Sequence, residues 1–96
     1  MISRKRLQLI QSAVEKASGC KAEHLESALV TETFRGEVVW EGVVEVFTLV
    51  GHAKAKHAYG WAFQDEEERF VTVLELPPVV SPETAVRAAI AAGGQK

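Results

Sequence analysis

The chain has 96 residues, of which 47% are hydrophobic and 25% charged, a composition typical of one ordinary globular domain that excludes the disordered and membrane classes. Its formal net charge of −2 provides no overall positive field, so any nucleic-acid affinity would depend on a local basic patch. The single cysteine, Cys20, excludes an intramolecular disulfide and favours a cytoplasmic location, and no apolar run approaches the roughly 20 residues of a membrane-spanning helix.

The first predicted element is an amphipathic helix over residues 4–18. Its apolar side chains recur at steps of three and four residues, which places them on one helical face: Leu7, Ile10, Val14 and Ala17. Ser3 is a suitable N-cap before it, and Gly19 is the residue type that commonly ends a helix in a left-handed conformation. The sequence therefore signals both ends of this helix.

From Leu29 to Leu76 the helical period disappears, and β-branched and aromatic residues predict an antiparallel sheet. Strands are expected at 28–34, 37–50, 57–64 and 69–76. Arg35 and Gly36 predict a tight turn between the first two strands, and Gly42 predicts a bulge or bend in the second. A helix over residues 52–62 is the alternative, because Ala and Lys favour helix, and it would remove one strand.

A closing helix is predicted to start at Ser81-Pro82-Glu83, which combines an N-cap, a first-turn proline and an acid near the positive helix end. Its apolar stripe is Val86, Ala89 and Ile90, and Gly93-Gly94 ends it. The predicted fold is therefore a single α+β domain over residues 1–96: a helix, an antiparallel sheet of three or four strands and a second helix.

The segment from residue 51 to residue 61 concentrates the side chains most suited to ligand binding: His52, Lys54, Lys56, His57, Tyr59 and Trp61. Lysine ammonium groups, a histidine donor and loop N–H groups together suit a phosphate. The alternative is a solvated connector whose lysines keep the loop in water.

The same segment, taken with Arg4, Lys5 and Arg6, offers basic groups and aromatic rings for nucleic-acid binding. The order of elements resembles that of the double-stranded-RNA-binding domain. The second helix here, however, opens with Ser81-Pro82-Glu83-Thr84, where that family carries a lysine cluster against phosphates. The resemblance therefore covers element order alone.

Two kinds of chemistry have weaker support in the sequence. An enzyme would use His52 or His57 as acid or base, Tyr59 as a donor and Glu41 or Glu45 as an orienting carboxylate, but no spacing selects these residues. Zinc ligands can be drawn from Cys20, His24, His52 and His57, without a recognised ligand spacing. We therefore assign no catalytic residue, metal or cofactor from the sequence.

The C-terminal two-thirds of the chain carries the pattern Trp40-Glu41-Gly42-x-Val44, Phe47-x-Leu49-x-Gly51-His52, Ala55, Tyr59-x-Trp61, Ser81-Pro82 and Ala85-Val86-Arg87-Ala88-Ala89-Ile90. This pattern resembles that of a group of small uncharacterised bacterial proteins. The resemblance implies proline at Ala53 and alanine at Gly60, so this chain departs from the pattern at two positions. It carries no activity, cofactor or site residue.

The expected function is that of a non-enzymatic interaction module that self-associates as a homodimer or binds a protein partner. If Gln64 pairs with Arg69, Tyr59 and Trp61 lie on the sheet face that the helices cover. The opposite face is then the expected interface and carries Ala58, Gly60, Ala62, Val71 and Val73.

Other arrangements and functions stay open. The sheet can instead curl over its second face, or the two helices can cover opposite sides. Nucleic-acid or phosphate-ligand binding through the segment from His52 to Trp61 is the alternative function, and a small enzyme is the third.

Overall fold

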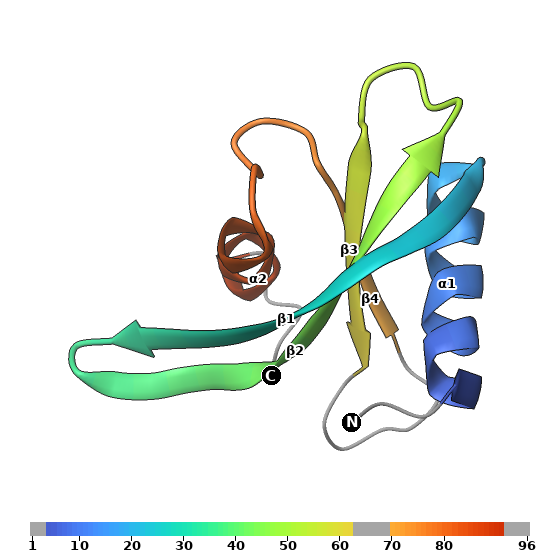
Figure 1. Cartoon of the computed structure of the whole chain (residues 1–96). Helices are drawn as coiled ribbons and strands as arrows, with labels where there is room; N and C mark the ends of the chain where they lie inside the picture. The colour runs from blue at the N-terminus through green and yellow to red at the C-terminus, as the bar shows by residue number, and fades with distance from the viewer. Residues whose placement is uncertain (1–3, 63–69, 92–96) are drawn as a thin grey trace.

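The computed structural model describes residues 4–62 and 70–91. Two helices flank four strands, and all neighbouring strands are antiparallel in the order β1-β2-β3-β4 (Figure 1). The elements are α1 Arg4–Ser18, β1 Lys21–Phe34, β2 Glu37–Val50, β3 His57–Ala62, β4 Phe70–Leu74 and α2 Pro82–Ala91. The predicted α+β fold is confirmed.

Helix α1 has the predicted bounds, with Ile10 and Val14 as its buried residues. The residue after its last turn is Gly19, whose φ of 72° is left-handed and whose N–H donates to the Glu15 carbonyl (2.9 Å). The predicted N-cap Ser3 lies outside the described residues. Gly19 and Cys20 connect the helix to strand β1.

Strand β1 starts at Lys21, so the expected start at residue 28 is wrong. In its first seven residues only Ala22 is buried, and Leu25 is an extra residue between the pairs His24–Phe47 and Glu26–Val46. A bulge of this kind interrupts the two-residue alternation that marks a strand. Backbone pairing with β2 holds this half of β1, and the sequence pattern carries no sign of that pairing.

The β1–β2 turn is confirmed, because Arg35 (φ 55°) and Gly36 (φ 81°) both adopt the positive φ of a type I′ turn. Of the bulge or bend predicted at Gly42, the bulge is wrong, since Gly42 pairs in register with Val30 and the extra residue of β2 is Val39. A Cβ on Gly42 would lie 3.1 Å from the Trp40 ring, so that glycine makes room for the indole.

Residues 57–62 form strand β3, so the alternative helix over residues 52–62 is wrong. The predicted end of β3 at residue 64 and start of β4 at residue 69 lie outside the described residues. At its other end β4 stops at Leu74, two residues before the expected end.

Helix α2 begins as predicted. The Ser81 Oγ accepts a hydrogen bond from the Thr84 N–H (3.2 Å), and the Thr84 Oγ1 accepts one from the Ser81 N–H (2.9 Å). This reciprocal capping satisfies donors that a helix start leaves without partners. The predicted end at Gly93-Gly94 lies outside the described residues.

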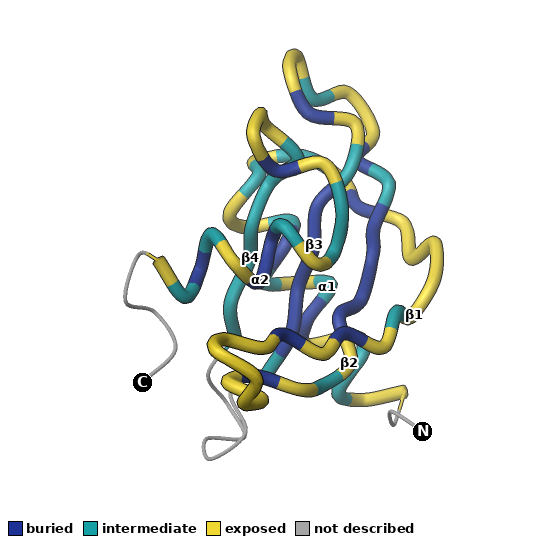
Figure 2. The backbone as a smooth tube through the Cα atoms, turned by 90° about the vertical axis from the view of Figure 1, so that its left-hand side faces the viewer, coloured by how far each residue is buried: buried dark blue, intermediate teal, exposed yellow. Residues whose placement is uncertain are grey.

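The two helices lie on opposite faces of the sheet, so the expectation that both cover one face is wrong (Figures 1 and 2). Under α1 lies a cluster made of Ile10, Val14, Ala22, Phe47, Leu49, Ala55 and Ala58. Under α2 lies a larger cluster made of Val30, Trp40, Val44, Val46, Tyr59, Trp61, Val79, Ala85, Val86 and Ala89. The molecule is therefore a three-layer α/β/α arrangement.

The β1–β2 hairpin extends well beyond the rest of the sheet (Figure 1). Strand β3 pairs with β2 only along residues 45–48, whereas β1 accompanies β2 to the turn. We call residues 28–44 the arm. Helix α2 lies along one side of the arm, where Val30 and Trp40 are buried and Arg87 Nε donates to Glu32 Oε1 (2.6 Å).

Candidate interaction surface

The predicted ligand-binding segment does not converge on one site. In the loop between β2 and β3, His52 Nδ1 accepts hydrogen bonds from the Lys54 N–H (3.1 Å) and the Ala55 N–H (2.8 Å). One ring nitrogen of His52 therefore holds the loop, while Lys54 and Lys56 are exposed. Trp61 is 1% exposed and packs edge-to-face on Trp40, so its ring is part of the core.

His57 and Tyr59 do meet, at a carboxylate that the sequence analysis did not single out. Glu75 Oε1 lies 3.0 Å from His57 Nδ1, and Glu75 Oε2 accepts a hydrogen bond from the Tyr59 hydroxyl (3.1 Å). Burial, reinforced by that carboxylate, raises the pKa of Tyr59 to about 12. The cluster ties the end of β4 to β3 and keeps the phenol neutral over the ordinary pH range.

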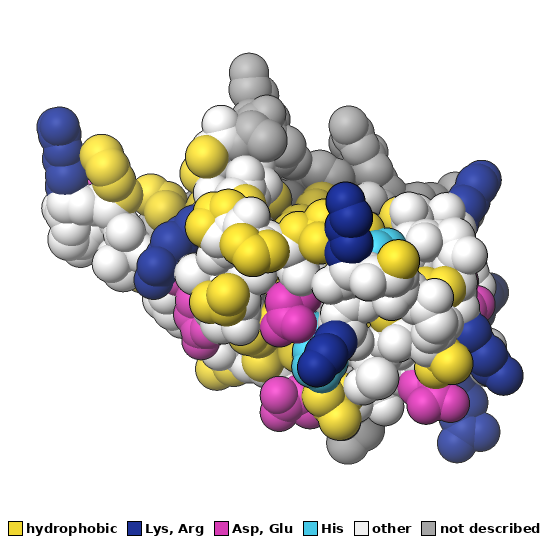
Figure 3. Space-filling view, turned by 90° about the horizontal axis from the view of Figure 1, so that it is seen from above, with side chains coloured by type: hydrophobic (Ala, Val, Ile, Leu, Met, Phe, Trp, Pro, Cys, Tyr) yellow, Lys and Arg dark blue, Asp and Glu magenta, His cyan; other side chains and the backbone are white. Residues whose placement is uncertain are grey.

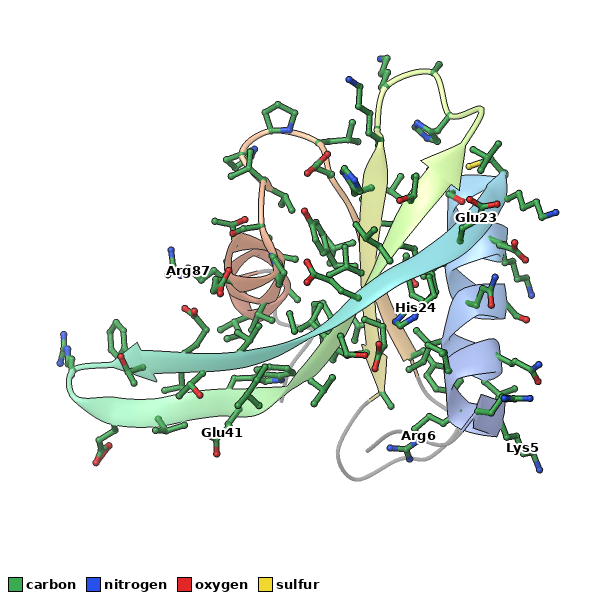
Figure 4. All side chains as sticks on the ribbon, in the orientation of Figure 1. Lys5, Arg6, Glu23, His24, Glu41 and Arg87 are labelled. Carbon is green, nitrogen blue, oxygen red and sulfur yellow. The ribbon has the colours of Figure 1, made fainter. Side chains whose placement is uncertain are left out.

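The two basic groups expected to form a nucleic-acid surface lie at opposite ends of the molecule. Lys5 and Arg6 are at the start of α1, at the bottom of Figure 4, whereas the loop between β2 and β3 is at the top. Seen from above, basic side chains stand apart among acidic and hydrophobic ones (Figure 3). The two groups therefore do not form one continuous basic surface.

A second buried cluster lies on the α1 side of the sheet. Glu45 is fully buried on β2, and its Oε1 accepts hydrogen bonds from Ser27 Oγ and His24 Nε2, the latter at 2.8 Å. Its Oε2 has no hydrogen-bond partner among the described residues. Because the carboxylate bridges the serine and the histidine, this is not the order of a nucleophilic triad, in which histidine stands between them.

The catalytic and zinc groupings that the sequence analysis considered do not come together among the described residues. Glu45 binds His24, and the carboxylate beside His57 is Glu75. Glu41 accepts a hydrogen bond from Thr31 on the arm (3.1 Å). In residues 4–62 and 70–91, no three His, Cys, Asp or Glu side chains lie close enough to hold a metal ion.

The predicted sheet-face interface is also wrong. Tyr59 pairs with Val73 and Trp61 with Val71, one residue away from the expected register. Val71 and Val73 therefore share a face with Tyr59 and Trp61, under α2, because a slip of one residue moves every side chain of a strand to the other face. The remaining predicted interface residues, Ala58, Gly60 and Ala62, lie on the α1 face.

Close packing of α1 leaves no room for a partner there. Ala58 and Gly60 are buried, and a Cβ built on Gly60 would lie 2.8 Å from Ile10 Cγ2 and 3.1 Å from Val14 Cγ2. The alternative in which the two helices cover opposite sides is the one that the structure shows.

An apolar surface is uncovered elsewhere, on the side of the arm that faces away from α2. Cross-strand partners share a side, so Leu29 pairs with Val43, Thr31 with Glu41 and Thr33 with Val38 on this side. Leu29 is 73% exposed, Val38 59% and Val43 45%. We call this side the arm face: Leu29, Thr31, Thr33, Val38, Glu41 and Val43.

Exposed apolar side chains continue to the end of the arm, where Figure 2 colours most residues as exposed. Val39 and Phe34 are exposed, and the Arg35 guanidinium lies 5.2 Å from the centre of the Phe34 ring. The sequence indicated that such a surface exists, because strand 37–50 carries apolar residues on both of its faces. Two helices leave part of such a strand uncovered.

No protein-family model, curated protein or solved structure matches the chain. Within the residues that the structure describes, no helix is both long and apolar enough to cross a membrane.

Proposed function

We propose that this chain is a non-enzymatic protein-interaction module that binds through the arm face. The observation that carries the proposal is the exposure of Leu29, Val38 and Val43 on one side of a hairpin whose other side is packed against α2. Burying a side chain of this kind contributes about 1.5–3 kcal/mol relative to leaving it in water. A partner seated on the arm face would supply that burial.

Helix α2 packs against one side of the arm and so preorganises the arm for binding on its other side. A two-stranded hairpin is at best marginally stable on its own in water. Here Val30 and Trp40 are buried beside α2, and the Arg87–Glu32 ion pair joins the helix to β1. An arm that is held in place before binding loses less conformational entropy when a partner arrives, which favours affinity.

Nucleic-acid or phosphate-ligand binding remains the alternative, with Lys54 and Lys56 as its candidate contacts. The separation of the basic groups gives it less support than the arm face gives protein binding. Salt distinguishes the two, because phosphate contacts weaken steeply as ionic strength rises and apolar association does not.

The proposal is tested by replacing Val38 with the photo-crosslinking amino acid benzoylphenylalanine and irradiating cells that produce the chain. We expect one defined adduct, identified by mass spectrometry, whose purified components bind each other and lose that binding with Val43→Lys. The matched control carries the same photo-crosslinker at Val80, which is 65% exposed and lies outside the arm. Absence of an adduct at position 38, or equal adducts at both positions, would overturn the proposal.

A further inference from the structure

We propose that His57 is a modification site whose Nε2 accepts a phosphoryl group from a small donor of the acyl phosphate or phosphoramidate class. This inference goes beyond the proposed function and does not depend on the arm face. It stands on the hydrogen bonds of the three histidines of the chain, all of which lie among the described residues.

A carboxylate fixes the tautomer of His57. Glu75 Oε1 lies 3.0 Å from His57 Nδ1, and an ionised carboxylate can only accept, so Nδ1 carries the ring proton and donates it. The lone pair of the neutral ring is therefore on Nε2. The His57 side chain is 33% exposed, and its Nε2 has no hydrogen-bond partner among the described residues and is not one of their buried polar atoms. A small molecule in solution can reach it.

Tyr59 holds Glu75 in this position. Its hydroxyl donates to Glu75 Oε2 (3.1 Å), so both oxygens of the carboxylate have a partner. A carboxylate that accepts from one ring nitrogen orients a histidine and raises the basicity of its other nitrogen, as it does for metal-binding and catalytic histidines. Glu75 and Tyr59 are therefore positioning residues for His57.

The other two histidines are arranged differently. His52 Nδ1 accepts two backbone hydrogen bonds, so its lone pair is engaged and its Nε2 carries the proton. His24 Nε2 lies 2.8 Å from Glu45 Oε1, so Nε2 is its donor and Nδ1 is its free nitrogen. Nδ1 is the more hindered nitrogen, because the neighbouring ring carbon bears the rest of the side chain. His57 is thus the histidine that presents a lone pair on the less hindered nitrogen.

The surroundings of His57 favour a phosphoryl group over an uncharged acyl group. Lys54 and Lys56 are exposed in the loop that leads into β3, and the view from above shows histidine surface beside basic side chains (Figure 3). These lysines attract the negative charge of a phosphoryl donor. The Glu75 carboxylate faces Nδ1, on the other side of the ring from the reacting Nε2.

The reaction needs a phosphoryl donor and no other reagent. The Nε2 lone pair attacks the phosphorus atom, the N–P bond forms, and the bond from phosphorus to the leaving group breaks; phosphoramidate releases ammonia, which takes the electron pair of the broken bond. The Nδ1 proton stays on the ring, which becomes positively charged beside Glu75. The hydrogen bond to that carboxylate is then charge-assisted and stabilises the product.

The test incubates the purified full chain with phosphoramidate at about pH 8, where an ordinary histidine is neutral. Mass spectrometry locates the phosphoryl group, and phosphorus NMR distinguishes attachment at Nε2 from attachment at Nδ1. We expect one phosphoryl group, on Nε2 of His57. His57→Gln should abolish the modification, and His24→Gln, the matched control, should leave it unchanged.

A second variant tests the role of the carboxylate. Glu75→Gln keeps an acceptor for Nδ1 but removes the negative charge, so we expect phosphorylation of the folded chain to slow by about tenfold or more. Circular dichroism checks the fold, and Tyr59→Phe replaces Glu75→Gln if the latter does not fold. Equal modification of all three histidines, as expected for the chain in urea, or a rate that neither variant changes, would overturn the proposal.

Discussion

At the scale of single residues, Tyr59 has the most clearly altered chemistry. It is buried, and its hydroxyl donates to Glu75. Burial, as the larger cause, and the nearby carboxylate together raise the pKa of Tyr59 to about 12. The folded chain therefore holds the phenol proton to a higher pH than the unfolded chain does. Its contribution to stability is fully present below about pH 10 and is lost as the pH rises towards 12.

Tyr59 is the only tyrosine, so phenolate absorbance reports on it alone. At pH 11 we expect about a tenth of Tyr59 to be ionised in the folded chain and about nine-tenths in urea. Circular dichroism at the same pH checks that the chain is folded. Glu75→Gln should lower the pKa only part of the way, because burial is the larger cause. A titration midpoint near 10 in a folded chain would contradict this.

The sequence singled out His57 and Tyr59 but not the carboxylate that joins them. Glu75 reaches them because β4 pairs with β3, and Glu45 meets His24 because β1 extends back to Lys21. These partners are far apart in the chain and depend on strand register. A single sequence records the residue types at a site, whereas register decides which of them meet.

At the scale of elements, α1, β2 and the start of α2 could be predicted because local chemistry determines them. The apolar stripe, Gly19, the Arg35-Gly36 turn and the Ser81 cap each act within a few residues. The face of the sheet on which each β4 side chain lies could not be predicted. The β3–β4 register differs by one residue from the pairing assumed at Gln64 and Arg69. This one-residue difference in register moves every β4 side chain to the opposite face of the sheet, and the predicted interface was wrong for that reason.

Gly60 has no side chain, and this allows α1 to pack closely against the sheet. Because an added Cβ would lie 2.8 Å from Ile10 Cγ2, Gly60→Ala should lower the free energy of unfolding by about 1–3 kcal/mol. Urea denaturation measures this change.

A second substitution tests the cause of that loss. Ile10→Leu removes the branch at Cβ that the alanine would strike, at a cost of its own below about 1.5 kcal/mol. The double variant should therefore be more stable than the sum of the two single losses predicts. Strict additivity would show that the Ile10 contact does not limit this position.

At the scale of the whole molecule, the two helices cover both faces of the sheet body, and the arm is the part left uncovered. The body therefore has its own core on each side of the sheet. Association through the arm face would add burial outside these two cores. Folding of the body and association through the arm face are consequently separable in experiment.

This separation gives a prediction for thermal unfolding. The homodimer expected from the sequence would stabilise the folded state by mass action, so the Tm of the wild-type chain should rise by several degrees between about 1 and 100 µM. About 1 kcal/mol shifts the Tm of a domain this size by roughly 4–8 °C. Val43→Lys should stay folded, with a Tm that does not change with concentration. Differential scanning calorimetry at matched concentrations measures both.

The two possible failures of that experiment have different meanings. A wild-type Tm that stays constant with concentration would contradict a dimer coupled to folding. A Val43→Lys chain that is unfolded at every concentration, while Val80→Lys is folded, would mean that the helices do not suffice to stabilise the body. The first outcome argues against a homodimer through the arm face. The second makes the arm contact part of the fold itself, because an obligate dimer has no stable folded monomer.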